Sequence, residues 1–499
     1  MQLSYILWLF FGIFIAYNIK LYMDSKVYYE MRIDKDSIFI NLFGKSIGNY
    51  GLELACKQFQ DYVNVTKFDA NFQLNGLTNI QQLLLTLSRF KKLKELNLQL
   101  GINPIQNTTV PNIQALLIQL QNLETLNLGL DNLFNHEGRS EIIKSISEMK
   151  KVHKLQISLI NTDLSDDKIN MLLPLAQMRQ LKSLELILMG CSLSSSSTKS
   201  LQTLLYKLPK LDNLVLNLYG NKIQVDGIDD LSAGLYHQKQ VKELEIELYF
   251  NNITSNGTET LMSVTGQMTN LTKLHIGLEF NYIEDQGAKY IAQALGNLQN
   301  LNDLSINAAS KNFGFLGYES ILLAIEKLST LQSLQLIIGV NKCGSRGADL
   351  LKKVLYKHDK LKTLILDYTE NYIGDAGASF VGEGLLSQKK LEFLKLNLNF
   401  NSISDRGAVD VVKSIHNLKH QPKHIDLRLS QNKITDKASK EILRYISNIT
   451  QQGVELFEFE FLGTALTNAT RDDLVQTSKN LNNFIFIVDT IPPSYWDEQ

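Results

Sequence analysis

The 499-residue chain has almost no excess charge and few cysteines, and both shortages exclude classes of protein. Its 50 Lys and Arg residues nearly balance its 51 Asp and Glu residues, so the formal net charge is −1. No overall positive field draws nucleic acid or an acidic membrane surface to the chain, and we expect no nucleic-acid partner. Three cysteines, an odd and low count for this length, argue against a disulfide framework.

Motifs of known catalytic sites are also missing. The chain has no nucleophile elbow, no kinase signature and no paired-carboxylate motif. Gly44-Lys45-Ser46 resembles the end of a phosphate-binding loop, but Phe39 stands where that loop requires its first glycine. These residues fit the turn of a repeat instead, so we predict no phosphate site there.

Three histidines are the closest approach to a metal site. His416, His420 and His424 follow each other at intervals of four residues, which on a helix would stack their imidazoles. Pro422 breaks that helix, and no cysteine or carboxylate completes a ligand set. We therefore predict that the chain is not an enzyme and binds no metal and no cofactor.

One long uncharged run is present, from Leu3 to Ile19. Its length is at the lower limit for a helix that spans a bilayer, and Tyr5 and Tyr17 stand where interfacial aromatics are expected. We predict a transmembrane anchor over residues 1–23 and a spacer over residues 24–34. The alternative is a cleaved signal peptide, but no Lys or Arg precedes the run and no small-x-small cleavage site follows it cleanly.

The charges after this run predict an orientation. Lys20, Lys26 and Arg32 follow it, whereas only the terminal amine precedes it. The positive-inside rule then places the large C-terminal part on the cytosolic or matrix-like side of a single-pass membrane protein. Asp24 and Glu30 dilute this bias. A mitochondrial membrane and an endomembrane both accept such an anchor, so the organelle stays open.

The rest of the chain repeats a unit of about 30 residues. Residues 271–300 and 391–420 share the pattern L-x-x-L-x-L-x-L-x-x-N-x-I-x-D-x-G-A, followed by a helical pattern. Sixteen units without linkers fill residues 35–499, including the caps at both ends. They begin at Lys35, Val65, Leu93, Leu123, Val152, Leu181, Leu211, Val241, Leu271, Leu301, Leu331, Leu361, Leu391, Pro422, Val454 and Leu481.

Each unit combines two periods. Apolar residues alternate over 274–278, which is the period of a strand, and recur at spacings of three and four over 291–298, which is the period of a helix. Asp285 stands at the expected helix N-cap, and Gly287 falls in the turn beside it. Each unit therefore predicts one strand followed by one helix.

One slot of the repeat is occupied by asparagine, whose amide can bond to the main chain of the loop that leaves each strand. Its members are Asn103, Asn221, Asn251, Asn281, Asn341, Asn371, Asn401 and Asn432. Cys191 fills this slot in its own unit, Cys343 fills the Ile slot two residues further on, and Cys56 aligns with Ala292. We therefore expect three buried, reduced thiols.

On these residues the chain resembles the leucine-rich-repeat family, most closely its ribonuclease-inhibitor-like subclass with a strand and a helix in each unit. The resemblance covers residues 35–499 and departs in one respect, an additional x-Leu before the Asn, which lengthens each strand. Strands stack about 4.8 Å apart while helices need about 10 Å, so the stack must curve. We expect an α/β solenoid, a horseshoe with a parallel concave sheet and convex helices.

Residues between the strand leucines point to the concave side and form the candidate partner-binding face. In the middle units they are Ile187, Val215, Asn217, Tyr219, Glu243, Glu245, Glu247, Tyr249, Lys273 and His275. Later units add Ile337, Ile365, Phe393, Lys395 and Arg428. Exposed apolar residues beside an acidic cluster are typical of a protein-binding patch. The alternative is that scattered apolar residues are normal on a sheet and that the charges are merely solvated.

Together these features favour a membrane-tethered scaffold for protein–protein interaction. Its partners would be other proteins, and it would serve as an accessory subunit of a larger membrane complex, for example a mitochondrial one. Two alternatives remain from the resemblance: receptor-type recognition of a ligand on the concave face, and regulation or inhibition of a partner enzyme.

Overall fold

The structure is a computed structural model that describes residues 31–309, 313–479, 481 and 483–487. The expected anchor over residues 1–23 lies outside this range. Among the described residues, no helix combines the length and the apolar character needed to cross a bilayer.

The chain divides into two compact units, Met1–Asn221 (unit 1) and Lys222–Gln499 (unit 2). The elements of unit 1 are β1 (Met31–Ile33), β2 (Ser37–Asn41), α2 (Gly48–Phe59), β3 (Lys67–Asn71), α3 (Gln81–Leu87), β4 (Glu95–Gln99), η1 (Asn107–Thr109), α4 (Val110–Gln119), β5 (Thr125–Gly129), α5 (His136–Ser147), β6 (Lys154–Ser158), η2 (Asp166–Gln177), β7 (Ser183–Ile187), α6 (Thr198–Tyr206) and β8 (Asn213–Asn217). Those of unit 2 are α7 (Gln224–Leu235), β9 (Glu243–Glu247), α8 (Ser255–Thr265), β10 (Lys273–Gly277), α9 (Glu284–Asn297), β11 (Asp303–Asn307), α10 (Phe315–Ile325), β12 (Ser333–Ile337), α11 (Gly344–Lys357), β13 (Thr363–Asp367), α12 (Gly374–Leu385), β14 (Phe393–Asn397), α13 (Asp405–His416), β15 (His424–Arg428), α14 (Asp436–Thr450), β16 (Leu456–Glu460), α15 (Asn468–Ser478) and β17 (Phe484–Ile487).

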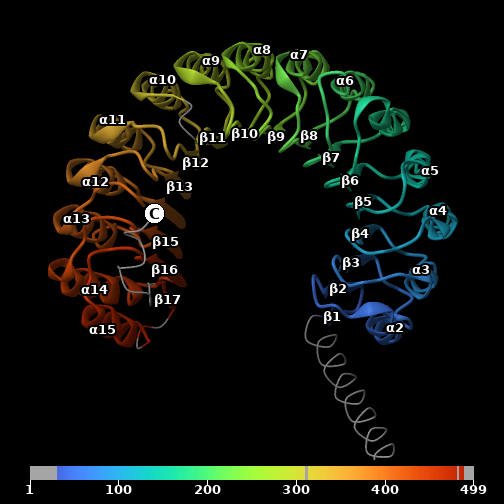
Figure 1. Cartoon of the computed structure of the whole chain (residues 1–499), viewed down its shortest axis with the longest axis horizontal. Helices are drawn as coiled ribbons and strands as arrows, with labels where there is room; N and C mark the ends of the chain where they lie inside the picture. Colours follow the sequence, from blue (N-terminus) through green and yellow to red (C-terminus); the bar gives the residue numbers. More distant parts are fainter. Residues whose placement is uncertain (1–30, 310–312, 480, 482, 488–499) are drawn as a thin grey trace, which may run out of the picture. The chain divides into compact units, whose positions relative to one another are not determined.

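Both units stack the same strand–helix element, and within each the strands form one layer and the helices another (Figure 1). In unit 1 each strand from β2 to β7 pairs in parallel with the next one, and in unit 2 each strand from β9 to β16 does the same. The expected alternation of strand and helix in an α/β repeat solenoid is confirmed. The short strand β1 falls within the predicted spacer and pairs antiparallel with β2, where it covers the edge of the sheet.

The leucine ridge of the repeat forms the core. Leu274 pairs in register with Leu304, and Leu304 with Leu334, so the same slot of successive units meets across the sheet. These side chains are buried between the sheet and its helices. Since helices pack on this side, the residues that alternate with the leucines lie on the opposite, open face of each sheet.

The asparagine amide bonds to the main chain of the loop that leaves each strand, as predicted, and it also bonds to the preceding repeat. The Asn281 side-chain oxygen accepts hydrogen bonds from the main-chain N–H of Asn251 (3.1 Å) and of Ile253 (3.0 Å). Its amide group donates to the carbonyls of Leu248 (2.8 Å) and Leu278 (3.0 Å). One buried side chain thus satisfies main-chain groups of two successive repeats, which would otherwise be stranded in the core.

The three cysteines are buried and unbridged, which confirms the expectation from their slots. The Cys191 thiol donates to the carbonyl of Leu159 at 3.0 Å, as the Asn221 amide donates to the carbonyl of Leu188 at 2.9 Å. A thiol therefore replaces one bond of the asparagine slot in this repeat.

The expected helix caps were assigned to the wrong helix. Asp285 lies in the first turn of α9, whose N-cap is Ile283. Its carboxylate instead accepts from the main-chain N–H of Gly314 (2.8 Å) and Gly317 (2.9 Å), at the start of α10. Helices that stack in parallel bring each acid beside the unpaired N–H groups of the next helix. A sequence pattern within one repeat does not reveal this contact.

The glycine that follows the acid of a repeat, for example Gly407 after Asp405, is needed for close packing rather than for a turn. Gly407 lies in the first turn of α13, and a Cβ there would come within 2.6 Å of the Asp375 carboxylate. Asp375 is the acid of the preceding repeat and bonds to the N–H of Ser404, the N-cap of α13, at 2.7 Å. The small residue lets the two helices approach closely enough for this cap to form.

Candidate functional site

The ten predicted residues of the binding face are divided between the two compact units, those up to Tyr219 in unit 1 and those from Glu243 onward in unit 2. In unit 1, Ile187 ends β7 and lies opposite Asn217 of β8, while Val215 lies opposite Glu185. These side chains are half-buried, and Tyr219, just beyond β8, is 36% exposed. This part of the predicted face is a modest apolar surface on an open sheet.

In unit 2 the predicted residues form rows across β9 and β10. Glu243 lies opposite Lys273, Glu245 opposite His275, and Glu247 opposite Gly277. The next strand, β11, continues these rows with Asp303, Ser305 and Asn307. These three residues were not predicted from the sequence, although they occupy the same columns of the following repeat.

Glu247 is not a solvated charge. It is only 9% exposed, and its carboxylate lies 2.6 Å from Nε2 of His275. Both side chains are largely covered, so the Glu247 carboxylate faces the imidazole ring rather than solvent.

Tyr249 extends this cluster across the gap left by Gly277. A Cβ at position 277 would collide with the Glu247 carboxylate and the Tyr249 ring, so both side chains would have to move to admit one. The Tyr249 hydroxyl accepts from the Asn307 amide at 3.0 Å, and that amide also donates to Glu279 at 3.1 Å. The ring therefore crosses β10 and reaches β11.

Burial changes the titration of two groups here. The pKa of Tyr249 is raised far above its ordinary value, first by burial and then by its contact with Glu247. Burial also raises the pKa of Glu279, although the hydrogen bond from Asn307 opposes the shift. Tyr249 thus stays neutral as a hydrogen-bonding group, and Glu279 carries a carboxylate that is poorly solvated.

Beside Glu279 lies a pair of stacked aromatic rings. Phe250 and Phe280 have ring centroids 4.1 Å apart and an interplanar angle of 12°. They remain 45% and 47% exposed. They were not predicted from the sequence, because the prediction followed only the residues that alternate with the leucines, whereas Phe250 and Phe280 lie outside that alternation, in the loops after β9 and β10. We call this pair the aromatic ledge.

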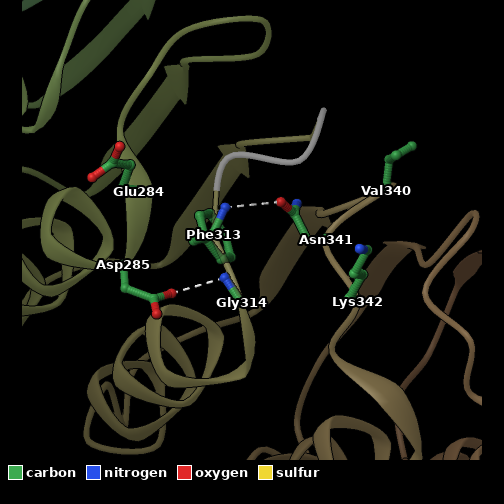
Figure 2. Close-up of a pocket in the computed structure, with 7 residues that line it drawn as sticks. All are labelled: Glu284, Asp285, Phe313, Gly314, Val340, Asn341 and Lys342. Atoms are coloured by element: carbon green, nitrogen blue, oxygen red, sulfur yellow. Dashed lines mark hydrogen bonds between the residues drawn. The ribbon is translucent and has the colours of Figure 1, made fainter.

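A separate feature of unit 2 is a cavity at the loops that precede α10 and α11. Its volume is about 360 Å³. Figure 2 shows its lining residues: Glu284, Asp285, Phe313, Gly314, Val340, Asn341 and Lys342. The Phe313 N–H already donates to Asn341 at 3.2 Å, and the Gly314 N–H to Asp285. Its main-chain donors are therefore occupied by bonds that hold the repeats together.

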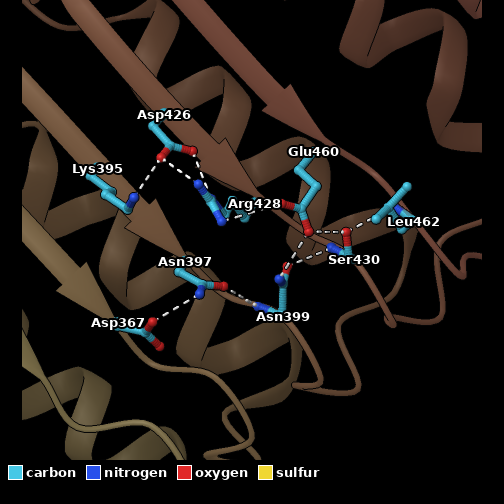
Figure 3. A network of polar contacts seen from close by, with 9 residues as sticks. All are labelled: Asp367, Lys395, Asn397, Asn399, Asp426, Arg428, Ser430, Glu460 and Leu462. Carbon is cyan, nitrogen blue, oxygen red and sulfur yellow. Dashed lines mark hydrogen bonds and ion pairs between the residues drawn. The ribbon is translucent and has the colours of Figure 1, made fainter. Parts of the chain in front are cut away.

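The later residues of the predicted face, Ile337, Ile365, Phe393, Lys395 and Arg428, are half-buried on β12 to β15. Two of them belong to a polar network (Figure 3). Asp426 accepts two hydrogen bonds from Arg428, each 3.0 Å, and pairs with Lys395 at 2.9 Å. Glu460 accepts from Ser430 at 2.9 Å and pairs with Arg428 at 3.4 Å. In this network Asp426 and Glu460 meet the cations Lys395 and Arg428, while Asp367 accepts a hydrogen bond from the Asn397 amide at 2.9 Å.

The three histidines considered as ligands do not converge. His424 begins β15 and lies 3.7 Å from Glu455, while His416 ends α13 and contacts Asn417. Within the described ranges, no group of three or more His, Cys, Asp or Glu side chains is arranged to hold a metal ion.

Strand–helix units with in-register parallel strands and a buried asparagine column define an α/β repeat solenoid. Comparisons with family models and with curated proteins find no match. Among solved structures, the chain is similar to one titled "Crystal structure of Rad7 and Elc1 complex in yeast", with a TM-score of 0.48. Sequence identity is 12%, over 88% of this chain and 92% of that chain.

Proposed function

We propose that this chain is a non-catalytic repeat protein that binds other proteins through the open sheet face of unit 2. The observation that carries the proposal is the surface over β9 to β11. There, Glu243, Lys273 and Asp303 stand in one row on a face that no helix covers, beside the exposed aromatic ledge. Aromatic residues with a polar surround are typical of protein-binding surfaces.

The buried thiols support a non-catalytic role. Burial raises the pKa of Cys56, Cys191 and Cys343 to about 12 in each case. Since the thiolate is the nucleophile, thiols that stay protonated at neutral pH are inert. They serve as packing residues of the repeat.

We further propose that residues 3–19 anchor the chain in a membrane, with the repeats on the cytosolic or matrix-like side, as an accessory subunit of a membrane complex. The support is the uncharged run with basic residues after it. Alkaline carbonate extraction should leave the full chain in the membrane pellet and release a variant that lacks residues 1–34. Release of both would refute the anchor.

The binding role is tested with a photo-crosslinking residue placed at one position at a time. Position 273 lies on the open face, and position 259 lies on the helix side in α8. The full chain, expressed at native abundance in its own cell, should form a discrete adduct with a partner protein from position 273 and not from 259. Adducts from 259 alone would move the binding surface to the helix side. A chain that purifies as a lone monomer in mild detergent, without adducts, would contradict the proposal.

A further inference from the structure

Carboxylates of the β9 to β11 surface are left without matching cations. Glu243 and Asp303 form no ion pair with any residue in the described ranges. Glu245 has a single long contact with Lys273, 3.8 Å, and Glu279 receives one hydrogen bond from a neutral amide. We call Glu243, Glu245, Glu279 and Asp303 the acidic patch. Four acids around one lysine give this surface a local negative charge.

A buried hydroxyl within the patch also lacks a partner. Ser305 is 5% exposed, and its Oγ has no hydrogen-bond partner among the described residues. It lies between His275 of β10 and Gln335 of β12, two residues after Asp303 on the same open face. A buried polar atom without a partner costs free energy, which a ligand that donates a hydrogen bond would recover.

The aromatic ledge adds a surface that the fold itself does not demand. Phe250 and Phe280 adopt left-handed φ angles of 52° and 55°. The same slot has a left-handed φ in other repeats too, where it holds glycine at Gly220 and Gly463 and larger residues at Val340, Glu370 and Phe400. Glycine adopts this conformation without strain, whereas a phenylalanine there carries a conformational cost and exposes its ring. Stacked rings beside Glu279 provide a face on which a cation can lie.

The same open face further along unit 2 shows that its acids need not be left unmatched. In the network of Figure 3, Asp426 is bonded by both Arg428 and Lys395. Glu460 is bonded by Ser430 and Asn399 and paired with Arg428. The acidic patch, on the same face and in the same fold, has four acids and Lys273 as their one cation, so its excess charge is a property of this location rather than of the repeat.

We propose that the acidic patch and the aromatic ledge bind a basic segment of the partner protein, one rich in Arg and Lys. This inference rests on the proposed function. Carboxylates and the Ser305 hydroxyl oxygen offer acceptors, and the Arg and Lys side chains carry donors and no acceptor. Guanidinium groups also stack on aromatic rings, which the ledge offers next to Glu279. The patch therefore supplies both contacts that such side chains make.

The test uses a fluorescent octa-arginine peptide and the full chain in detergent micelles. The triple variant Glu243→Gln/Glu245→Gln/Asp303→Asn removes three charges from the patch with little change in shape. We expect its Kd to rise about tenfold, since each exposed charge contributes modestly. The matched control Asp229→Asn/Glu259→Gln/Glu392→Gln removes three exposed charges elsewhere in unit 2. Its Kd should stay within about twofold of the parent value.

A second variant, Phe250→Ser/Phe280→Ser, changes no charge and should weaken binding several-fold. Equal weakening by the patch and control triples would reduce the effect to net charge and overturn the proposal. Displacement of the peptide by calcium chloride, but not by sodium chloride of equal ionic strength, would make the patch a cation site and overturn it too. So would a patch-dependent dimer in sedimentation, since a second copy would then be the occupant.

The crosslinking experiment separates this inference from the proposed function. If the partner adduct at position 273 persists undiminished in the patch triple, protein binding stands and the basic-segment inference fails. If no partner adduct forms in the parent chain although octa-arginine binds at the patch, the proposed function fails. Loss of the adduct in the patch triple alone, with a normal urea unfolding curve, supports both.

Discussion

At the scale of single residues, Glu247 and Tyr249 can pack over position 277 because glycine has no Cβ there. Gly277→Ala should destabilise the chain by about 1–3 kcal/mol, because its Cβ would displace Glu247 and Tyr249 from their contacts. The control is Gly296→Ala in α9, where a Cβ meets nothing within 4 Å. That change should stabilise by about 0.4–1 kcal/mol. Urea unfolding of both variants checks the prediction, and equal midpoints would contradict it.

The acid beside the ledge should make stability depend on pH. The folded pKa of Glu279 is raised, chiefly by burial, so its proton is held more tightly in the folded chain. Its contribution is therefore fully present below the ordinary pKa of about 4.3 and is lost as pH rises through the folded value. Glu279→Gln should gain stability relative to the parent as pH rises from about 4 to 7, measured by urea midpoints.

Asp426, on the same face, should show the opposite sign. Burial alone would raise its pKa, but hydrogen bonds from Arg428 and Lys395 lower it below the ordinary value. Its contribution is then present above about pH 3.9 and is lost as pH falls through the folded pKa. Asp426→Asn should cost about 1–3 kcal/mol at pH 7, and the deficit should shrink in acid. Parallel pH profiles for Glu279→Gln and Asp426→Asn would contradict both assignments.

At the scale of the strand–helix element, the asparagine slot should contribute strongly to the free energy of unfolding, because each asparagine bonds to main-chain groups of two repeats. Asn281→Ala leaves main-chain groups of two repeats unpaired in the core, and each such group costs about 1–3 kcal/mol. Asn302, exposed and without a side-chain hydrogen bond in the described range, is the matched control. Asn302→Ala should stay within about 0.5 kcal/mol of the parent in the same unfolding assay.

The acid that caps the next helix should stabilise a neighbour rather than its own element. Asp375→Ala removes the acceptor of Ser404 and Gly407, at the start of α13, and should cost about 1–2 kcal/mol. Hydrogen exchange should therefore rise most in the first turn of α13, not of α12. Increased exchange confined to α12 would restore the cap to its own helix. Asp226→Ala is the control, since Asp226 lies in the first turn of α7 and its side chain forms no hydrogen bond or ion pair among the described residues.

The positions of the strands and helices were the features that the sequence predicted best. Each strand and helix is set by local periods of two and of three to four, which a single repeat already displays. The partner of Asp285 was not accessible in this way, because Gly314 lies one repeat later and its position depends on how two helices stack. The same limit applies to the aromatic ledge, since two residues 30 positions apart become neighbours only when their loops stack.

At the scale of the whole molecule, the three buried thiols report on the two compact units. Cys56 and Cys191 belong to unit 1 and Cys343 to unit 2. A maleimide should label none of them in the native chain at neutral pH, because all three are buried and burial raises each thiol pKa to about 12. In rising urea, mass spectrometry should show Cys56 and Cys191 labelled together, as their unit opens. Rapid native labelling of any one would contradict its burial.

The sequence by itself determined the unit of this protein, because a 30-residue segment with one apolar ridge cannot bury that ridge alone and must stack on copies of itself. It also determined which side chains reach the open face, since a strand alternates. Only the tertiary structure decided which of those side chains neutralise one another and which do not. Asp426 meets two cations and Asp303 meets none among the described residues, although both lie on the same face, because pairing requires a cation that reaches the acid from the same or the neighbouring strand, as Arg428 and Lys395 do.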